Sequence, residues 1–95
     1  MIEVLFTKEA TDNLVEQAQY IYQQTLDLDK ADKYLLMMKN DIINSLGHFP
    51  YLGRPVVGFG EDIRKFVHMS FTILYKIQSD KVYILTIYRE NLPKL

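Results

Sequence analysis

The 95-residue chain contains no cysteine and no tryptophan, and it has only four glycines and three prolines. Without cysteine there is neither a disulfide nor thiolate chemistry. No apolar run approaches the roughly 18 residues that a membrane span requires. The chain has no internal repeat, and its contents of apolar residues (48%) and charged residues (24%) are close to the globular average. These features predict a single folded domain over residues 1–95.

The amino terminus lacks the features of a secretory signal. Glu3 stands where a signal would be basic, and Lys8 and Glu9 follow the short apolar run. We therefore expect a cytoplasmic protein that has no contact with a membrane.

The formal net charge of -1 hides an uneven distribution of charge along the chain. Residues 1–62 contain five Lys/Arg and ten Asp/Glu, a net charge of -5, whereas residues 63–95 contain six Lys/Arg and two Asp/Glu, a net charge of +4. This asymmetry indicates either an acidic partner for the basic third of the chain or two solvated surfaces of opposite sign.

Apolar spacing in the first half of the chain predicts a strand and two helices. Residues 2–6 form a short β-branched run before Thr7, which is a competent helix N-cap. The first helix should end near residues 24–26, and the second should run from an Asp29 N-cap to a stop at Gly47. Two helices of about 17 residues joined by about three or four residues form an antiparallel hairpin. The apolar stripes are Ala10, Leu14, Ala18 and Ile21, then Ala31, Leu35, Met38, Ile42 and Leu46.

The second half of the chain predicts a loop and three strands. The loop covers residues 49–60, which contain two prolines and three glycines. Strands follow at residues 62–68, 71–78 and 82–89, separated by short turns. The order β-α-α-β-β-β predicts an α+β fold, with the helix hairpin packed on one face of a small, mainly antiparallel sheet.

The register of the last hairpin predicts which side chains share a face. A turn centred on Ser79 and Asp80 pairs Tyr75 with Ile84 and Phe71 with Tyr88 beneath the helices. A one-residue bulge would reverse the faces for half of the hairpin. In the regular register the open face of the sheet holds Lys76, Lys81, Tyr83 and Arg89.

The sequence shows no pattern typical of a metal or cofactor site. His48 and His68 are too few and too poorly spaced for zinc, and the acids of residues 27–32 lack the rest of a calcium loop. We expect no metal and no cofactor.

Phosphodiester chemistry is the one reaction for which the chain has suitable residue types. Cleavage of RNA needs a base, an acid and fixed cations around the phosphate. The alternative is that the tyrosines pack in the core or on the sheet and the arginines contact a partner. The candidates for RNA cleavage are Arg64, His68, Tyr88 and Arg89, with Tyr75 and Tyr83 nearby in the sequence.

An ordered set of motifs carries a resemblance that covers nearly the whole chain. The motifs are FTKEA at residues 6–10, FPYLGRP at 49–55, Gly60, Ile63-Arg64, FTILYKI at 71–77 and VYILTIYR at 82–89. This set resembles the ParE branch of the RelE/ParE toxin superfamily of bacterial toxin–antitoxin modules. The resemblance implies an αα-hairpin against a small antiparallel sheet, and a toxin held inactive by an antitoxin whose tail wraps around it.

The two branches of that superfamily imply different activities. ParE-like members inhibit DNA gyrase by trapping its cleaved DNA complex and are not catalysts, whereas RelE-like members are ribosome-dependent endoribonucleases. RelE-like enzymes commonly carry arginine where Thr72 follows Phe71, and a net charge of -1 is unfavourable for docking into ribosomal RNA. These two features favour the ParE branch. Tyr88 stands where many ParE-like chains have histidine, and this departure weakens an acid–base role at that position.

The leading hypothesis is a toxin of the plasmid-stabilisation type that binds gyrase and catalyses nothing. Two alternatives stay open: a ribosome-dependent endoribonuclease that cleaves messenger RNA, and an inactive module that only binds an antitoxin. The residues expected to bind the target are Arg54, Arg64, Lys76 and Arg89, on the basic open face of the sheet and its adjoining loop.

Overall fold

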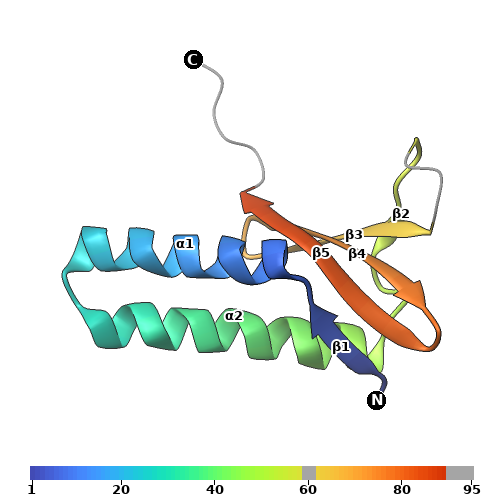
Figure 1. The fold of residues 1–95 in the computed structure, drawn as a ribbon, viewed down its shortest axis with the longest axis horizontal. Helices are drawn as coiled ribbons and strands as arrows, with labels where there is room; N and C mark the ends of the chain where they lie inside the picture. The colour runs from blue at the N-terminus through green and yellow to red at the C-terminus, as the bar shows by residue number, and fades with distance from the viewer. Residues whose placement is uncertain (59–61, 90–95) are drawn as a thin grey trace.

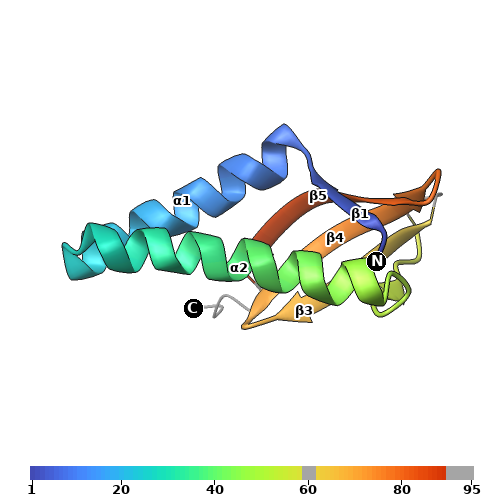
Figure 2. The same cartoon turned by 90° about the horizontal axis from the view of Figure 1, so that it is seen from below.

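The computed structural model describes residues 1–58 and 62–89 and confirms the predicted fold class. Two helices pack on one face of a five-stranded sheet, and their connection projects beyond the sheet (Figures 1 and 2). Gly60 and the end of the predicted loop lie outside the described residues. The elements are β1 (Glu3–Phe6), α1 (Lys8–Thr25), α2 (Leu28–His48), β2 (Arg54–Pro55), β3 (Ile63–His68), β4 (Phe71–Gln78) and β5 (Lys81–Arg89).

The strand order across the sheet is β1-β5-β4-β3-β2. β1 pairs with β5 in parallel, and the other neighbours pair antiparallel. β2 is a two-residue strand within the predicted loop, where Arg54 and Pro55 pair with Lys65 and Arg64. Proline is tolerated there because β2 lies at the edge of the sheet.

Thr7 joins the start of α1 to the sheet. Its hydroxyl oxygen accepts a hydrogen bond from the amide of Ala10 at 3.2 Å and donates to the carbonyl of Ile84 at 2.9 Å. The Thr7 amide also donates to the carbonyl of Ile84, at 3.1 Å. One residue therefore caps the helix, as predicted, and fixes its entry angle over β5.

The connection between the helices is shorter than predicted. The N-cap of α2 is Asp27 rather than Asp29, and the Asp27 carboxylate accepts from the amide of Lys30 at 3.2 Å. The chain reverses within two residues because Leu26 adopts the left-handed conformation, with φ 54°, and its amide closes α1 by donating to the carbonyl of Tyr22.

Gly47 does not end α2, which continues through His48. A Cβ at position 47 would lie 2.7 Å from the Cγ of Met1, and the Gly47 carbonyl accepts from the amide of Ile2 at 2.9 Å. The glycine therefore permits the amino terminus to pass close to the helix. In the sequence, a glycine with this role cannot be distinguished from a glycine that ends the helix.

The core lies between the helix hairpin and the sheet. Side chains from both predicted helical stripes meet side chains of β4 and β5, and Tyr75 is fully buried among them. Within the described residues, none of the helices is long and apolar enough to cross a membrane. The buried cluster comprises Ala10, Leu14, Met38, Ile42, Leu46, Ile73, Tyr75, Val82, Ile84 and Ile87.

A bulge divides the β4–β5 hairpin into two halves with different registers. Tyr75 pairs with Ile84 as predicted, but the register shifts between Leu74 and Tyr75, so that Ile73 pairs with Ile87 instead of Thr86. The physical reason is burial, because the shift places an isoleucine, 1% exposed, in the core where the regular register would place a threonine.

Two predicted side-chain positions are corrected by this shift. Tyr88 was expected beneath the helices, but it pairs with Thr72 and is 45% exposed. Arg89 was expected on the open face, but it pairs with Phe71 and so lies on the face that the helices cover.

Beyond Ile84, polar groups on the outer edge of β5 form hydrogen bonds with a side chain of α1. β1 pairs with β5 only as far as Ile84. Further along, the Asn13 side-chain oxygen accepts from the amide of Ile87 at 2.9 Å and from the hydroxyl of Thr86 at 3.0 Å. These bonds occupy part of an edge that would otherwise offer free backbone groups.

Substitution Thr7→Ala tests the junction between α1 and the sheet. Loss of the cap and of the bond to Ile84 should lower the free energy of unfolding by about 1–2 kcal/mol. Urea denaturation followed by circular dichroism measures this. The matched control is Thr11→Ala on the exposed side of α1. Equal stability of the two variants would contradict the bridging role.

Candidate functional site

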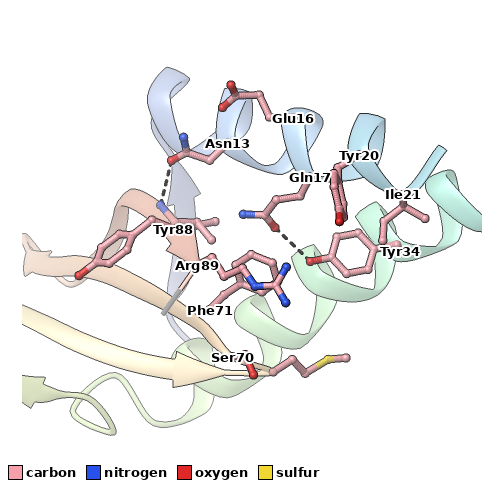
Figure 3. Close-up of a pocket in the computed structure, with 12 residues that line it drawn as sticks. Asn13, Glu16, Gln17, Tyr20, Ile21, Tyr34, Ser70, Phe71, Tyr88 and Arg89 are labelled. Atoms are coloured by element: carbon pink, nitrogen blue, oxygen red, sulfur yellow. Dashed lines mark hydrogen bonds between the residues drawn. The ribbon is translucent and has the colours of Figure 1, made fainter. Parts of the chain in front are cut away.

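A groove of about 760 Å³ opens between the helix hairpin and the end of the sheet where β5 stops (Figure 3). One wall comes from α1 and α2, and the other comes from the β3–β4 turn and the last residues of β5. Its lining is mainly aromatic and aliphatic, with a few polar groups. The lining residues are Asn13, Glu16, Gln17, Tyr20, Ile21, Tyr34, Met69, Ser70, Phe71, Ile87, Tyr88 and Arg89.

Arg89 supplies a positive charge in this aromatic groove. Its side chain extends from the end of β5 past Phe71 toward Tyr34 (Figure 3). The Tyr34 hydroxyl donates to the Gln17 side-chain oxygen at 3.1 Å, and its ring packs against Phe71 with centroids 6.5 Å apart. Burial raises the pKa of Tyr34, and the charge of Arg89 partly opposes that shift. The groove can therefore accept an apolar side chain beside a carboxylate.

Arg64 holds the loop that precedes β2. Its Nη1 donates to the carbonyl of Gly53 at 2.7 Å, and its guanidinium lies 4.8 Å from the centroid of the Tyr51 ring. The hydroxyl of the buried Tyr75 accepts from the amide of Gly53 and donates to the carbonyl of Pro50, both at 2.8 Å. Arg64 and Tyr75 thus fix the same stretch of backbone, residues 50–53.

The two arginines that sequence singled out lie at opposite ends of the helix-covered face. Arg64 pairs with Tyr75 and Arg89 pairs with Phe71, four positions away along β4. A strand rises about 3.3 Å per residue and strands lie about 4.8 Å apart, so the two backbones are roughly 16 Å apart. The fully buried Ile73 lies between them. They do not form one phosphate-binding cluster.

The remaining candidates for proton transfer are also divided. His68 Nε2 lies 2.9 Å from an Asp41 carboxylate oxygen, and the histidine ring stacks on Phe66 with centroids 5.9 Å apart. His68 pairs with Phe71, so it stands near the Arg89 end of the sheet. Tyr88, the residue before Arg89 in β5, projects from the opposite face of the strand, although part of it lines the groove.

The predicted basic surface is split between the two faces of the sheet. Arg64 shares the face of Tyr75, its cross-strand partner, and therefore does not lie on the open face. Arg54 pairs with Lys65, and Lys76 occupies the same face two residues beyond the partner of Lys65. Arg54 and Lys76 thus remain on the open face, whereas Arg64 and Arg89 do not.

The sequence did not predict the groove, although two of its lining residues, Tyr88 and Arg89, were candidate site residues. Tyr20 of α1 and Tyr34 of α2 both line the groove, and the Tyr34 hydroxyl also bonds across the helix hairpin to Gln17. Among the described residues, no three His, Asp or Glu side chains gather where they could hold a metal ion.

Residues 4–91 match the family described as the ParE toxin of the type II toxin–antitoxin system parDE. The chain belongs to this family. No curated protein matches the sequence significantly.

Solved structures of the wider superfamily share this ParE-family fold. The chromosomal ParDE system of P. aeruginosa superposes with a TM-score of 0.74 at 17% identity, over 95% of this chain and 97% of that chain. The toxin–antitoxin complex RelBE2 of Mycobacterium tuberculosis gives 0.67 at 18%, over 94% and 98%. A YoeB/ParE toxin of Agrobacterium tumefaciens gives 0.59 at 14%, over 94% and 99%. At these identities the likeness establishes the fold.

Substitution Tyr75→Phe tests the anchoring of the loop. At neutral pH it leaves the buried Gly53 amide without its partner, which should lower the free energy of unfolding by about 1–3 kcal/mol. Burial raises the pKa of Tyr75 above its ordinary value of 10.0, so the stabilisation is complete below pH 10 and is lost as the pH rises through the folded-state pKa.

Urea unfolding of the wild type and the Tyr75→Phe variant between pH 7 and pH 11 therefore measures a stability gap that narrows at alkaline pH. Tyr22→Phe, which removes a hydroxyl from an exposed ring, is the matched control and should show no gap. A gap that stayed constant over this range would contradict the role given to the Tyr75 hydroxyl.

Proposed function

We propose that this protein is the toxin of a ParE-type toxin–antitoxin module, that it acts by binding DNA gyrase, and that a cognate antitoxin neutralises it. The observation that carries binding over catalysis is the separation of Arg64 from Arg89. Cleavage of RNA requires an acid, a base and cations around one phosphate. Here Arg64 is engaged with the loop carbonyl of Gly53, and Tyr88 faces the opposite side of the sheet from Arg89.

The proposed target surface is the β2 end of the sheet with its loop. Arg54 and Lys76 present positive charge on the open face there, and Arg64 lies on the other side of the same end. These residues belong to the group expected from the sequence to bind the target. Positive charge at this end favours encounter with an acidic surface.

The groove around Arg89 is the proposed docking point for the antitoxin. It offers an aromatic slot in which Arg89 supplies a guanidinium and Glu16 a carboxylate, and the guanidinium suits a peptide segment carrying an apolar residue and a carboxylate. The similar protein of M. tuberculosis was solved as a complex of toxin and antitoxin. A tail that starts in this groove and wraps around so small a domain would exclude a partner as large as gyrase.

Expression without the antitoxin tests the activity directly. We expect growth arrest with DNA-damage signalling, and inhibition of gyrase supercoiling by the purified protein. Arrest of protein synthesis with cleaved messenger RNA and no effect on gyrase would instead support the endoribonuclease, with Arg64, His68, Tyr88 and Arg89 as candidates. Absence of any growth arrest would support the inactive antitoxin-binding module.

Substitution Arg89→Ala tests the docking point of the antitoxin. Loss of a charge-assisted hydrogen bond should weaken antitoxin binding by about tenfold or more, and inhibition of gyrase should persist. Titration calorimetry with the product of the adjacent reading frame measures the affinity. Lys33→Ala on the exposed side of α2 is the control. Unchanged antitoxin affinity of the Arg89 variant would place the antitoxin elsewhere.

A further inference from the structure

We propose that the loop of residues 49–57, here called the docking loop, is the element that grips the target, and that it fits an apolar recess with an acidic rim on a protein surface. This inference rests on the proposed function for the identity of the target. The argument for the surface itself rests on exposure, anchoring and charge within the described residues.

The docking loop exposes large apolar side chains in unusual density. Four of its nine residues are apolar and more than half exposed: Phe49 at 66%, Tyr51 at 67%, Leu52 at 51% and Val57 at 97%. Connecting loops are normally polar and rich in turn-forming residues. Exposed apolar groups gathered in one segment mark an interaction surface.

The backbone of the docking loop is fixed by bonds that reach into the core. The Tyr75 hydroxyl, which is fully buried, bonds both Pro50 and Gly53. A Cβ at position 53 would lie 2.7 Å from the Tyr75 hydroxyl and from the Lys65 carbonyl, so only glycine fits. The amide of Val56 donates to the carbonyl of Ile63 at 2.9 Å and fixes the second half.

This anchoring has a consequence for binding. A loop that is already ordered loses little conformational entropy when it binds, so its apolar side chains contribute more of their burial to affinity. The Tyr75 hydroxyl, Arg64 and Gly53 hold the backbone of the docking loop in place. The apolar side chains that this backbone carries are exposed and do not pack in the core. Such an arrangement is typical of a preorganised binding surface.

The charge around the docking loop indicates an acidic partner. The sequence from His48 to Lys65 contains three cations, Arg54, Arg64 and Lys65, and two acids, Glu61 and Asp62, so that this segment has a net charge of +1. Leu52 and Val57 are aliphatic side chains that neither stack on bases nor bond to phosphates. The combination favours a protein surface over a nucleic acid.

The docking loop lies at the far end of the sheet from the groove. β2 pairs at Arg64 and Lys65, whereas the groove is formed by the β3–β4 turn and Arg89. Figure 1 shows the loop and β2 at one end of the molecule and the helix connection at the other. A substitution in the loop can therefore change target binding without touching the groove.

The test is a charge pair at the most exposed position of the docking loop. Val57→Asp and Val57→Lys remove the same side chain, and neither should disturb folding because Val57 is 97% exposed. Against an acidic apolar recess, the Asp variant should lose about tenfold or more in gyrase inhibition, and the Lys variant should stay within about threefold of the wild type. Leu28→Asp, at the exposed helix connection, is the control and should have no effect.

Two readouts separate this inference from the choice of target. Supercoiling by purified gyrase reports on gyrase alone, and growth arrest reports on the target whatever its identity. If the Asp and Lys variants differ in growth arrest although the wild type does not inhibit gyrase, the role of the docking loop is supported and gyrase is rejected as the target. If both variants match the wild type in both readouts, the docking loop is overturned.

A direct binding measurement distinguishes the class of partner. The wild type and both variants are titrated with immobilised gyrase in the absence of DNA, and separately with duplex DNA alone. Binding to gyrase that the Asp variant loses supports a protein recess. Binding to DNA alone that the Asp variant loses, with no binding to gyrase, would overturn the protein partner in favour of a nucleic-acid surface.

Discussion

The β-bulge opposite Leu74 and Tyr75 is the constraint on which the surface of this protein depends. One extra residue in β5 exchanges the two faces of the strand for all that follows. It brings Ile87 into the core, turns Tyr88 to the open face and turns Arg89 to the face on which the helices pack. Without it the groove would contain a threonine and a tyrosine in place of an isoleucine and an arginine. The position of Arg89 in the groove is therefore a consequence of core packing.

The fold class followed from the sequence because its signals are local. Apolar residues recur at helical spacing over both helices, and Thr7 is an N-cap in sequence and structure alike. The errors fall where a local pattern has two physical meanings. Gly47 reads as a helix stop but makes room for Met1, and both Asp27 and Asp29 are competent caps. Tertiary contacts decide which of the two roles a residue takes, and a local sequence pattern contains no information about those contacts.

The functional surfaces were less predictable because they depend on register and on distant contacts. Arg64 and Arg89 were singled out from the sequence as target-binding candidates, but the faces of the sheet on which they lie follow from pairing with Tyr75 and Phe71. Tyr75 looked like an ordinary core aromatic, and its ring is buried as expected. Its hydroxyl reaches Pro50 and Gly53, more than twenty residues earlier in the chain. A contact at that separation leaves no periodic trace in the sequence.

The placement of the basic residues gives the charge asymmetry of the chain a physical meaning. The basic third supplies β3, β4 and β5, so its cations are distributed by strand alternation over two faces and two ends. Arg89 enters the groove, Arg64 braces the docking loop, and Lys76 stays on the open face. The proposed function requires one surface for the antitoxin and a separate surface for the target. Strand alternation in a short sheet, shifted once by a bulge, is sufficient to produce them.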